Sequence, residues 1–144
     1  MMTEQSKVFL AVDIGASSGR VMAALFDGNT IELQEVHRFV NGATEIDGEY
    51  HWDIHARFDA IKEGLTKAAA TYGDAIVSIG VDTWGVDYGL LDADGNLMGL
   101  PFAYRDPRTN GMDEEAIKRV PREKIYETTG IQFMFFNTLN QLMS

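Results

Sequence analysis

Cysteine is absent from this chain of 144 residues, which therefore forms neither a disulfide nor a thiolate metal site. It has no apolar run long enough to cross a bilayer, and residues 1–7 are polar, without the apolar core of a signal peptide. From these absences we expect no membrane partner and a cytoplasmic location.

Basic residues are scarce. Lys and Arg number 12 against 22 Asp and Glu, for a formal net charge of −10. This charge opposes long-range attraction to nucleic acid, so we expect no nucleic-acid partner. An anionic ligand has to be bound by local donors.

Hydrophobic residues make up 45% of the chain, enough at this length for one core and a single α/β or α+β domain. Apolar periodicity and turn residues predict strands at 7–14, 20–26 and 30–40, which form an antiparallel meander. A short excursion over 41–52 leads to a helix that begins after Asp53 as its N-cap and stops at Gly73. The residues expected on its buried face are Ile54, Phe58, Ile61, Leu65, Ala68 and Tyr72.

The second half of the chain alternates strand and helix signals. β-Branched residues at 76–81 predict a buried central strand, and a further strand is expected at 86–91 before a turn at 92–95. Helices are predicted at 113–120 and 121–129, with Pro121 in a first-turn position, and another helix starts at Asn137.

The segment from Asp13 to Arg20 is a candidate phosphate-binding loop. Gly15 and Gly19 permit unusual backbone angles, Ser17 and Ser18 supply hydroxyl and amide donors, and Arg20 adds a positive charge. Asp13, at the end of the first strand, is placed to hold a hydrated Mg²⁺ ion. The alternative is a tight hairpin turn without a ligand.

The element order is typical of a ribonuclease H-like fold: a mixed sheet made from a three-stranded meander, then a helix and further strands. This fold is shared by nucleases and by actin-like ATPases, and topology does not choose between them. A two-metal nuclease would use carboxylates such as Asp13, Glu63 and Asp82. The chain has no basic patch to bind a polynucleotide, which disfavours that alternative.

Four blocks carry a resemblance to a known family. They are Asp13–Arg20, Asp82–Asp92, Pro101–Gly111, and Gly130–Phe133 with Phe136–Leu139. In this order they resemble the FGGY carbohydrate kinases, and the second and third blocks resemble the members that act on L-rhamnulose. The resemblance implies an actin-like ATPase fold and phosphorylation of L-rhamnulose at its 1-hydroxyl, with ATP and Mg²⁺ as cofactors.

Binding residues follow from the matched positions. The ATP-contacting loop of the family matches Ala16, Ser17, Ser18, Gly19 and Arg20, and a sugar-contacting glycine matches Gly85. Fuculose and xylulose are alternative substrates. A lysine that ends a family signature is replaced here by Gln141, so no phosphate contact is assigned to that position.

Around Gly85, other side chains suit a sugar. Trp84 offers an apolar plane, and Asp87, Arg105 and Asp106 can hydrogen-bond hydroxyl groups. The alternatives are that Trp84 is a core residue and that Arg105 and Asp106 form a structural ion pair. Three further aromatic residues, Phe133, Phe135 and Phe136, are expected to serve packing.

The resemblance implies two domains, with nucleotide and sugar bound between them. We therefore expect residues 1–144 to be a truncated amino-terminal domain, with the second domain absent. The family's general base, an aspartate, lies in that second domain, so no catalytic residue is assigned here. We expect the fragment alone to be inactive and to self-associate through surface that the missing domain would cover. A non-catalytic actin-like binding module is the alternative.

Overall fold

The structure, a computed structural model, describes residues 7–144. The described chain divides into two compact units. The first contains the residues up to Gly42 together with Asp53–Trp84, and the second contains Ala43–Trp52 and Gly85–Ser144. Each unit is described by itself.

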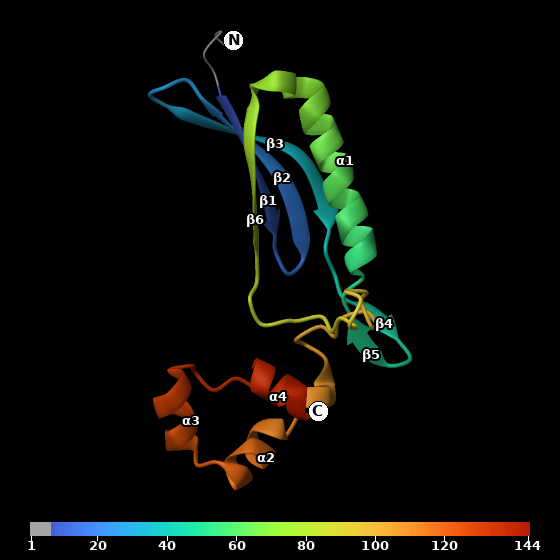
Figure 1. Cartoon of the computed structure of the whole chain (residues 1–144), viewed down its shortest axis with the longest axis vertical. Coiled ribbons are helices and arrows are strands. Elements are labelled where there is room, and N and C mark those ends of the chain that lie inside the picture. Colours follow the sequence, from blue (N-terminus) through green and yellow to red (C-terminus); the bar gives the residue numbers. More distant parts are fainter. Residues whose placement is uncertain (1–6) are drawn as a thin grey trace. The chain divides into compact units, whose positions relative to one another are not determined.

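A four-stranded mixed sheet forms the first unit (Figure 1). Strands β1 (Lys7–Ile14), β2 (Ser18–Phe26) and β3 (Ile31–Val40) are antiparallel neighbours, and β6 (Ile76–Thr83) runs parallel to β1. The order in the sheet is β3-β2-β1-β6. The predicted meander is therefore confirmed, and the later strand returns beside the first.

Helix α1 (Ile54–Tyr72) lies along one face of this sheet (Figure 1). As predicted, Asp53 is its N-cap, and its carboxylate accepts a hydrogen bond of 2.9 Å from the Ala56 N–H. Gly73 ends the helix at a φ of 50° and opens the short 3₁₀ turn η1 (Gly73–Ala75). The core between helix and sheet is built on Val8, Leu10, Ala23 and Ala68.

Two expectations about burial are wrong for the described chain. Phe58 is 61% exposed, because the contact face of α1 centres on Gly64 and Ala68, and Lys62 lies over the Phe58 ring. Strand β6 is an edge strand rather than a central one, and Val77, Ile79 and Val81 are at least half exposed. Its β-branched composition predicted a strand correctly but not the number of its neighbours.

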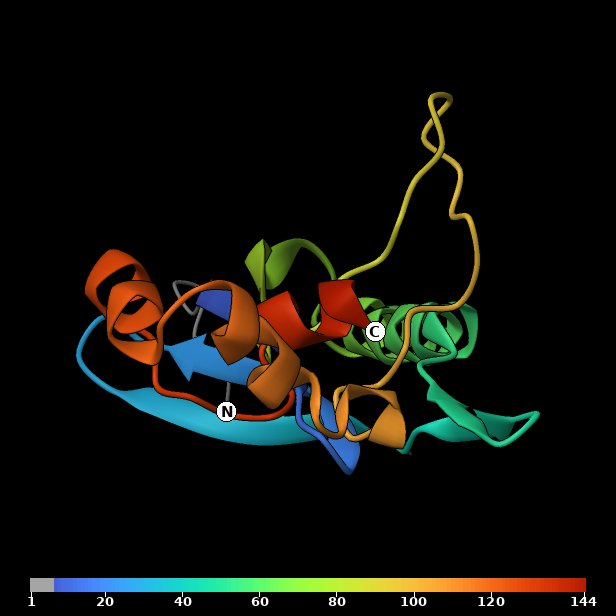
Figure 2. The ribbon, with the colours of Figure 1, turned by 90° about the horizontal axis from the view of Figure 1, so that it is seen from below.

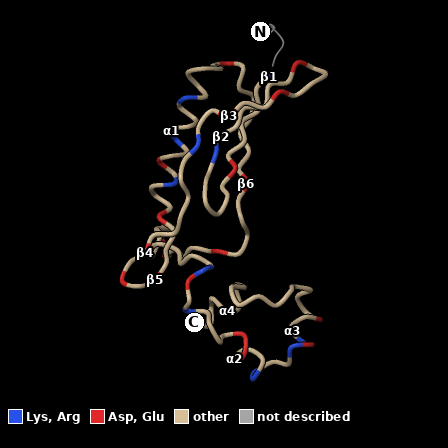
Figure 3. Tube along the Cα trace, turned by 180° about the vertical axis from the view of Figure 1, so that it is seen from behind, with Lys and Arg blue, Asp and Glu red and all other residues tan. Residues whose placement is uncertain are grey.

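Charged residues of both signs occur along α1 (Figure 3). Lys62 pairs with Asp59 at 2.8 Å, and Lys67 pairs with Glu63 at 2.7 Å. The hydrogen bonds from these lysines lower the pKa of both carboxyl groups. Exposed pairs of this kind contribute little to stability.

The second unit starts with a hairpin within the predicted excursion. Strands β4 (Thr44–Ile46) and β5 (Glu49–His51) are antiparallel, and their turn places Asp47 and Gly48 at positive φ. The chain after β5 lies beside residues 100–103, since the Trp52 N–H donates to the Pro101 carbonyl at 2.8 Å. The 3₁₀ turn η2 (Pro107–Thr109) follows.

Three short helices complete this unit: α2 (Met112–Arg119), α3 (Arg122–Thr129) and α4 (Thr138–Met143). The first two lie within one residue of their predicted bounds, although Pro121 is the N-cap of α3 rather than its first residue. Asn137 is the N-cap of α4, as the predicted helix start requires.

The predicted strand at 86–91 is wrong. This segment is part of a loop that extends away from the helices of its unit (yellow in Figure 2), and its one ladder contact is a bridge between Leu91 and Leu97. The predicted turn is present, because the Asp92 carboxylate accepts from the N–H groups of Asp94 and Asn96 at 2.9 and 2.8 Å. Among residues 7–144, no helix has the length and apolar content needed to span a membrane.

The close approach of α1 to the sheet at Gly64 is testable. A Cβ atom there would lie 2.4 Å from Val21 Cγ2 and 3.1 Å from His37 Cβ. Although alanine favours helix by about 1 kcal/mol, we expect Gly64→Ala to lower the free energy of unfolding by about 1–3 kcal/mol. Urea denaturation measures this change.

The matched control is Gly80→Ala, because no atom lies within 4 Å of a Cβ at Gly80. We expect this variant to unfold at the same urea concentration as the unmodified protein or a higher one. A Gly64→Ala variant as stable as the unmodified protein would contradict the contact.

Candidate functional site

The candidate phosphate-binding segment is a tight hairpin turn. Residues 15–17 connect β1 to β2, and the Gly15 N–H donates to the Ser18 carbonyl at 3.0 Å. Asp13 lies in β1, whereas Ser18, Gly19 and Arg20 lie in β2, so the loop is shorter than predicted. The segment thus has tight-turn geometry, with Asp13 and Arg20 side by side on neighbouring strands.

The two glycines of this turn are explained by packing. Neither Gly15 nor Gly19 has a positive φ, so the predicted need for unusual backbone angles is wrong. A Cβ on Gly19 would lie 2.1 Å from Cζ of Phe39, and one on Gly15 would lie 3.1 Å from the Ser18 carbonyl oxygen. Glycine at position 19 therefore makes room for the Phe39 ring on β3.

Asn41, which was not predicted to be a site residue, binds the backbone of the turn by hydrogen bonds. Its side chain is 1% exposed and donates from Nδ2 to the Gly15 carbonyl at 2.5 Å, while its N–H donates to the Ser17 carbonyl at 3.1 Å. Its side-chain oxygen accepts from Arg57 Nε on α1. Arg57 also donates to the Gly42 carbonyl at 2.7 Å. In the sequence, Asn41 and Gly42 are only the start of the short excursion expected over 41–52.

Charged side chains form a row across the ends of the four strands. The strand register aligns Arg38, Arg20, Asp13 and Asp82 on β3, β2, β1 and β6. Arg20 Nη2 lies 2.5 Å from Asp13 Oδ2, and both side chains are about 40% exposed. Val12 and Val21, one residue away from this pair, are buried. Because side chains alternate along a strand, the charged row lies on the face opposite α1.

This row of charged side chains is better suited to a metal ion held jointly with phosphate oxygens and water than to one held by protein side chains alone. Within residues 7–144, no three His, Asp or Glu side chains lie close enough to hold a metal together. Asp13 and Asp82 are direct neighbours on parallel strands. Mg²⁺ is commonly held by one or two carboxylates together with phosphate oxygens and water, which suits this pair.

The carboxylates that a nuclease would need do not converge. Glu63 lies on α1, which covers the other face of the sheet, and its carboxylate pairs with Lys67. Asp13 and Asp82 share the face opposite α1. The geometry therefore gives no support to the nuclease alternative.

In the second unit, Asp87 is held by two other side chains. It accepts hydrogen bonds from Trp52 Nε1 and, at 3.3 Å, from Gln141 Nε2. Gln141 is 2% exposed and also donates to the carbonyls of Val86 and Phe136 at 3.1 and 2.9 Å. Trp52 and Gln141 were not selected from the sequence, because their partner at position 87 is remote along the chain.

Asp106 and Arg105 differ in their surroundings. Asp106 is 2% exposed and accepts from the N–H groups of Tyr50 and Arg108 at 2.7 and 2.8 Å. Its ion-pair partner is Arg108, at 3.9 Å. The alternative prediction of an ion pair between Arg105 and Asp106 is therefore wrong. Arg105 is exposed and donates from Nε to the Tyr104 hydroxyl at 3.0 Å.

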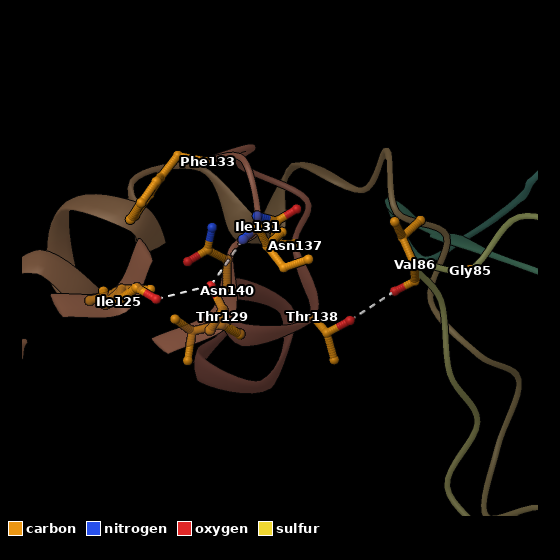
Figure 4. A pocket seen from close by; sticks show the side chains of 11 residues that line it. Gly85, Val86, Ile125, Thr129, Ile131, Phe133, Asn137, Thr138 and Asn140 are labelled. Atoms are coloured by element: carbon orange, nitrogen blue, oxygen red, sulfur yellow. Dashed lines mark hydrogen bonds between the residues drawn. The ribbon is translucent and has the colours of Figure 1, made fainter. Parts of the chain in front are cut away.

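Gly85 lies at a pocket of about 320 Å³ in the second unit (Figure 4). Apolar side chains of Ile125, Ile131 and Phe133 form much of its wall, and Thr138 donates to the Val86 carbonyl at its edge. Asp87, Arg105 and Asp106 are not among the lining residues. Trp84, which is half-buried, belongs to the first unit.

The aromatic run contributes packing contacts within the second unit. The Phe135 and Phe136 rings meet edge to face at 5.1 Å, and Phe136 also contacts the Tyr104 ring at 5.3 Å. Arg122 lies over the Phe133 ring at 4.1 Å. These contacts agree with the packing role expected from the sequence.

Comparison with known proteins gives consistent matches. The sequence is 48% identical over 134 residues to a rhamnulokinase from Bacteroides thetaiotaomicron, covering 93% of this chain and 27% of that protein. The fold resembles a gluconate kinase from Lactobacillus acidophilus, with a TM-score of 0.76, 16% identity, and coverage of 96% of this chain and 28% of the other.

A ligand-bound xylulose kinase from the same organism has a TM-score of 0.74 at 18% identity, over 95% of this chain and 28% of the other. The chain thus spans little more than a quarter of the length of these relatives. At such low identity the two structures show the fold alone, which is that of the actin-like ATPases. The model of the FGGY family of carbohydrate kinases, N-terminal domain, matches residues 8–143. This chain therefore belongs to the FGGY family of carbohydrate kinases.

Proposed function

We propose that the complete protein transfers the γ-phosphate of ATP to the 1-hydroxyl of L-rhamnulose. The observation that carries the proposal is the similarity to a rhamnulokinase over 93% of this chain, which includes both the β1–β2 turn and the blocks around Trp84 and Arg105. This chain supplies part of the phosphate site and part of the sugar site. The attacking hydroxyl is deprotonated by a base outside these residues.

The β1–β2 turn binds the phosphates of ATP in this proposal. Backbone and hydroxyl donors of residues 16–19 face the phosphates, and Arg20 binds the γ-phosphate. Phosphoryl transfer depends mainly on positioning and on charge stabilisation, so a fixed turn with an adjacent cation suits the reaction. The hydrogen bonds from Asn41 to the Gly15 and Ser17 carbonyls keep the turn in one conformation.

Asp13 would hold the hydrated Mg²⁺ ion, with Asp82 as a second carboxylate beside it. When bound, the metal neutralises charge on the phosphate oxygens. Asp13 also pairs with Arg20 at 2.5 Å, which fixes the direction of the guanidinium group. The two groups thus share one role, the orientation of a charged phosphate.

The sugar contacts come from Trp84, Gly85, Asp87 and Arg105. Trp52 and Gln141 fix the Asp87 carboxylate, and Arg105 is exposed with its Nε on the Tyr104 hydroxyl. Asp106 has a positioning role, because it is 2% exposed and accepts from two backbone N–H groups, whereas Asp87 is half-buried. A fixed carboxylate and an exposed guanidinium are suited to orienting a polyol.

The activity is tested on the complete protein. ADP formation is followed with ATP, Mg²⁺ and L-rhamnulose, L-fuculose or D-xylulose, and the 144-residue chain alone serves as the inactive control. We expect kcat/KM for L-rhamnulose to exceed the others at least about tenfold. A preference for another ketose would refute the substrate, and no turnover with any sugar would favour a binding module.

The role of Asn41 is tested with Asn41→Ala. The substitution leaves the Gly15 carbonyl without its side-chain donor, so we expect KM for ATP to rise about tenfold. KM for L-rhamnulose stays unchanged, because the residues that Asn41 contacts, Gly15, Ser17 and Arg57, are not proposed sugar contacts. Asn29→Ala, on the exposed turn between β2 and β3, is the control, and equal losses for both substrates would contradict a local role.

The role of Trp84 is tested with Trp84→Ala and Trp84→Phe. Loss of the aromatic plane is expected to raise KM for L-rhamnulose about five- to tenfold with KM for ATP unchanged, whereas phenylalanine retains most of the contact. An unchanged KM for L-rhamnulose in Trp84→Ala would show that Trp84 is only a packing residue.

A further inference from the structure

We propose that Arg38, on β3, is a second phosphate-binding residue beside Arg20. This inference rests on the proposed function, since it extends the phosphate site of the β1–β2 turn. The strand register places Arg38 directly opposite Arg20 on the neighbouring strand. Their side chains therefore share the face of the sheet that also carries Asp13.

The Arg38 guanidinium reaches Ser18, the first residue after the turn. Its Nη1 lies 3.4 Å from the Ser18 hydroxyl oxygen. Ser18 is two residues from Arg20 on β2, so both side chains lie on the same face of the strand. The phosphate turn thus has one guanidinium from β2 and another from β3.

A β-bulge holds Arg38 in this position. The register between β2 and β3 shifts between Val21 and Met22, which brings Glu35 to the same face as Arg38 although the two are three residues apart. Glu35 accepts from Arg38 Nε at 3.1 Å and from Nη2 at 2.5 Å. The Arg38 hydrogen bond lowers the pKa of Glu35, so the carboxylate stays ionised at neutral pH.

Both arginines keep donors for an anion. A guanidinium has five N–H donors, and within residues 7–144 Arg38 spends three of them, on Glu35 and Ser18. The Arg20 Nε is enclosed and has no hydrogen-bond partner among the described residues. Because it is enclosed, this nitrogen is not available to an anion; the Arg20 side chain is 40% exposed and donates to Asp13 only from Nη2, so its other Nη hydrogens are available.

The charge arrangement points the same way. Like charges directly opposite each other on neighbouring strands are unfavourable, and the Arg20–Arg38 pair is offset here by Asp13 and Glu35. The Arg38 side chain is 49% exposed, and exposed ion pairs stabilise a fold little. Charge-assisted hydrogen bonds to phosphate are stronger, so binding is the property that Arg38 serves.

The experiment measures binding of ATP, inorganic tripolyphosphate and L-rhamnulose to the complete protein by calorimetry. Arg38→Ala is expected to weaken ATP and tripolyphosphate binding about tenfold and to leave L-rhamnulose binding and the urea midpoint unchanged. Arg38→Lys restores part of the loss. The control is Arg119→Ala, at an exposed position on α2, which changes nothing.

The possible results distinguish the role of Arg38 from the proposed kinase function on which it rests. If Arg20→Ala weakens phosphate binding and Arg38→Ala does not, Arg38 is not a phosphate residue and the kinase proposal stands. If neither variant alters tripolyphosphate or ATP binding, the phosphate site itself is misplaced. If Arg38→Ala lowers the urea midpoint and all three affinities together, Arg38 is only structural and the inference is overturned.

Discussion

The hydrogen bonds of Asn41 are the constraint on which the β1–β2 turn depends. A turn of three residues between two strands has few internal contacts, and here a buried amide holds the Gly15 and Ser17 carbonyls from below. Arg57 fixes that amide from α1, so the helix and the turn are joined through one side chain. Buried polar groups of this kind specify a single geometry because leaving any one of them unpaired is costly.

The alternation of side chains in the sheet places the core residues and the charged residues on opposite faces. Val8, Leu10 and Ala23 face α1 and form the core, while Asp13 and Arg20 face the other way. Gly19 lies on the buried face of β2, and because it has no side chain the Phe39 ring packs against the strand there. The bulge in β3 interrupts the alternation on that strand and brings Glu35 beside Arg38.

In the second unit, candidate sugar residues also carry structural hydrogen bonds. Asp106 connects Tyr50 to the turn at Arg108, and Asp87 connects Trp52 to Gln141. A carboxylate bound on several sides loses conformational freedom before any ligand arrives, which reduces the entropic cost of binding. Asp106 is 2% exposed, whereas Arg105 is exposed.

The sequence by itself determined the meander, helix α1 with its cap at Asp53, the helices α2 and α3, and the kinase family. Local periodicity, capping and contiguous motifs carry these features. Only the tertiary structure decided that β6 lies at an edge of the described sheet, that 86–91 is a loop and that Gly19 makes room for Phe39. It also decided that Arg38 and Asn41 contact residues 15–18 and that Asp82 lies beside Asp13. These depend on strand register and on contacts between residues far apart in the chain, which local patterns do not encode.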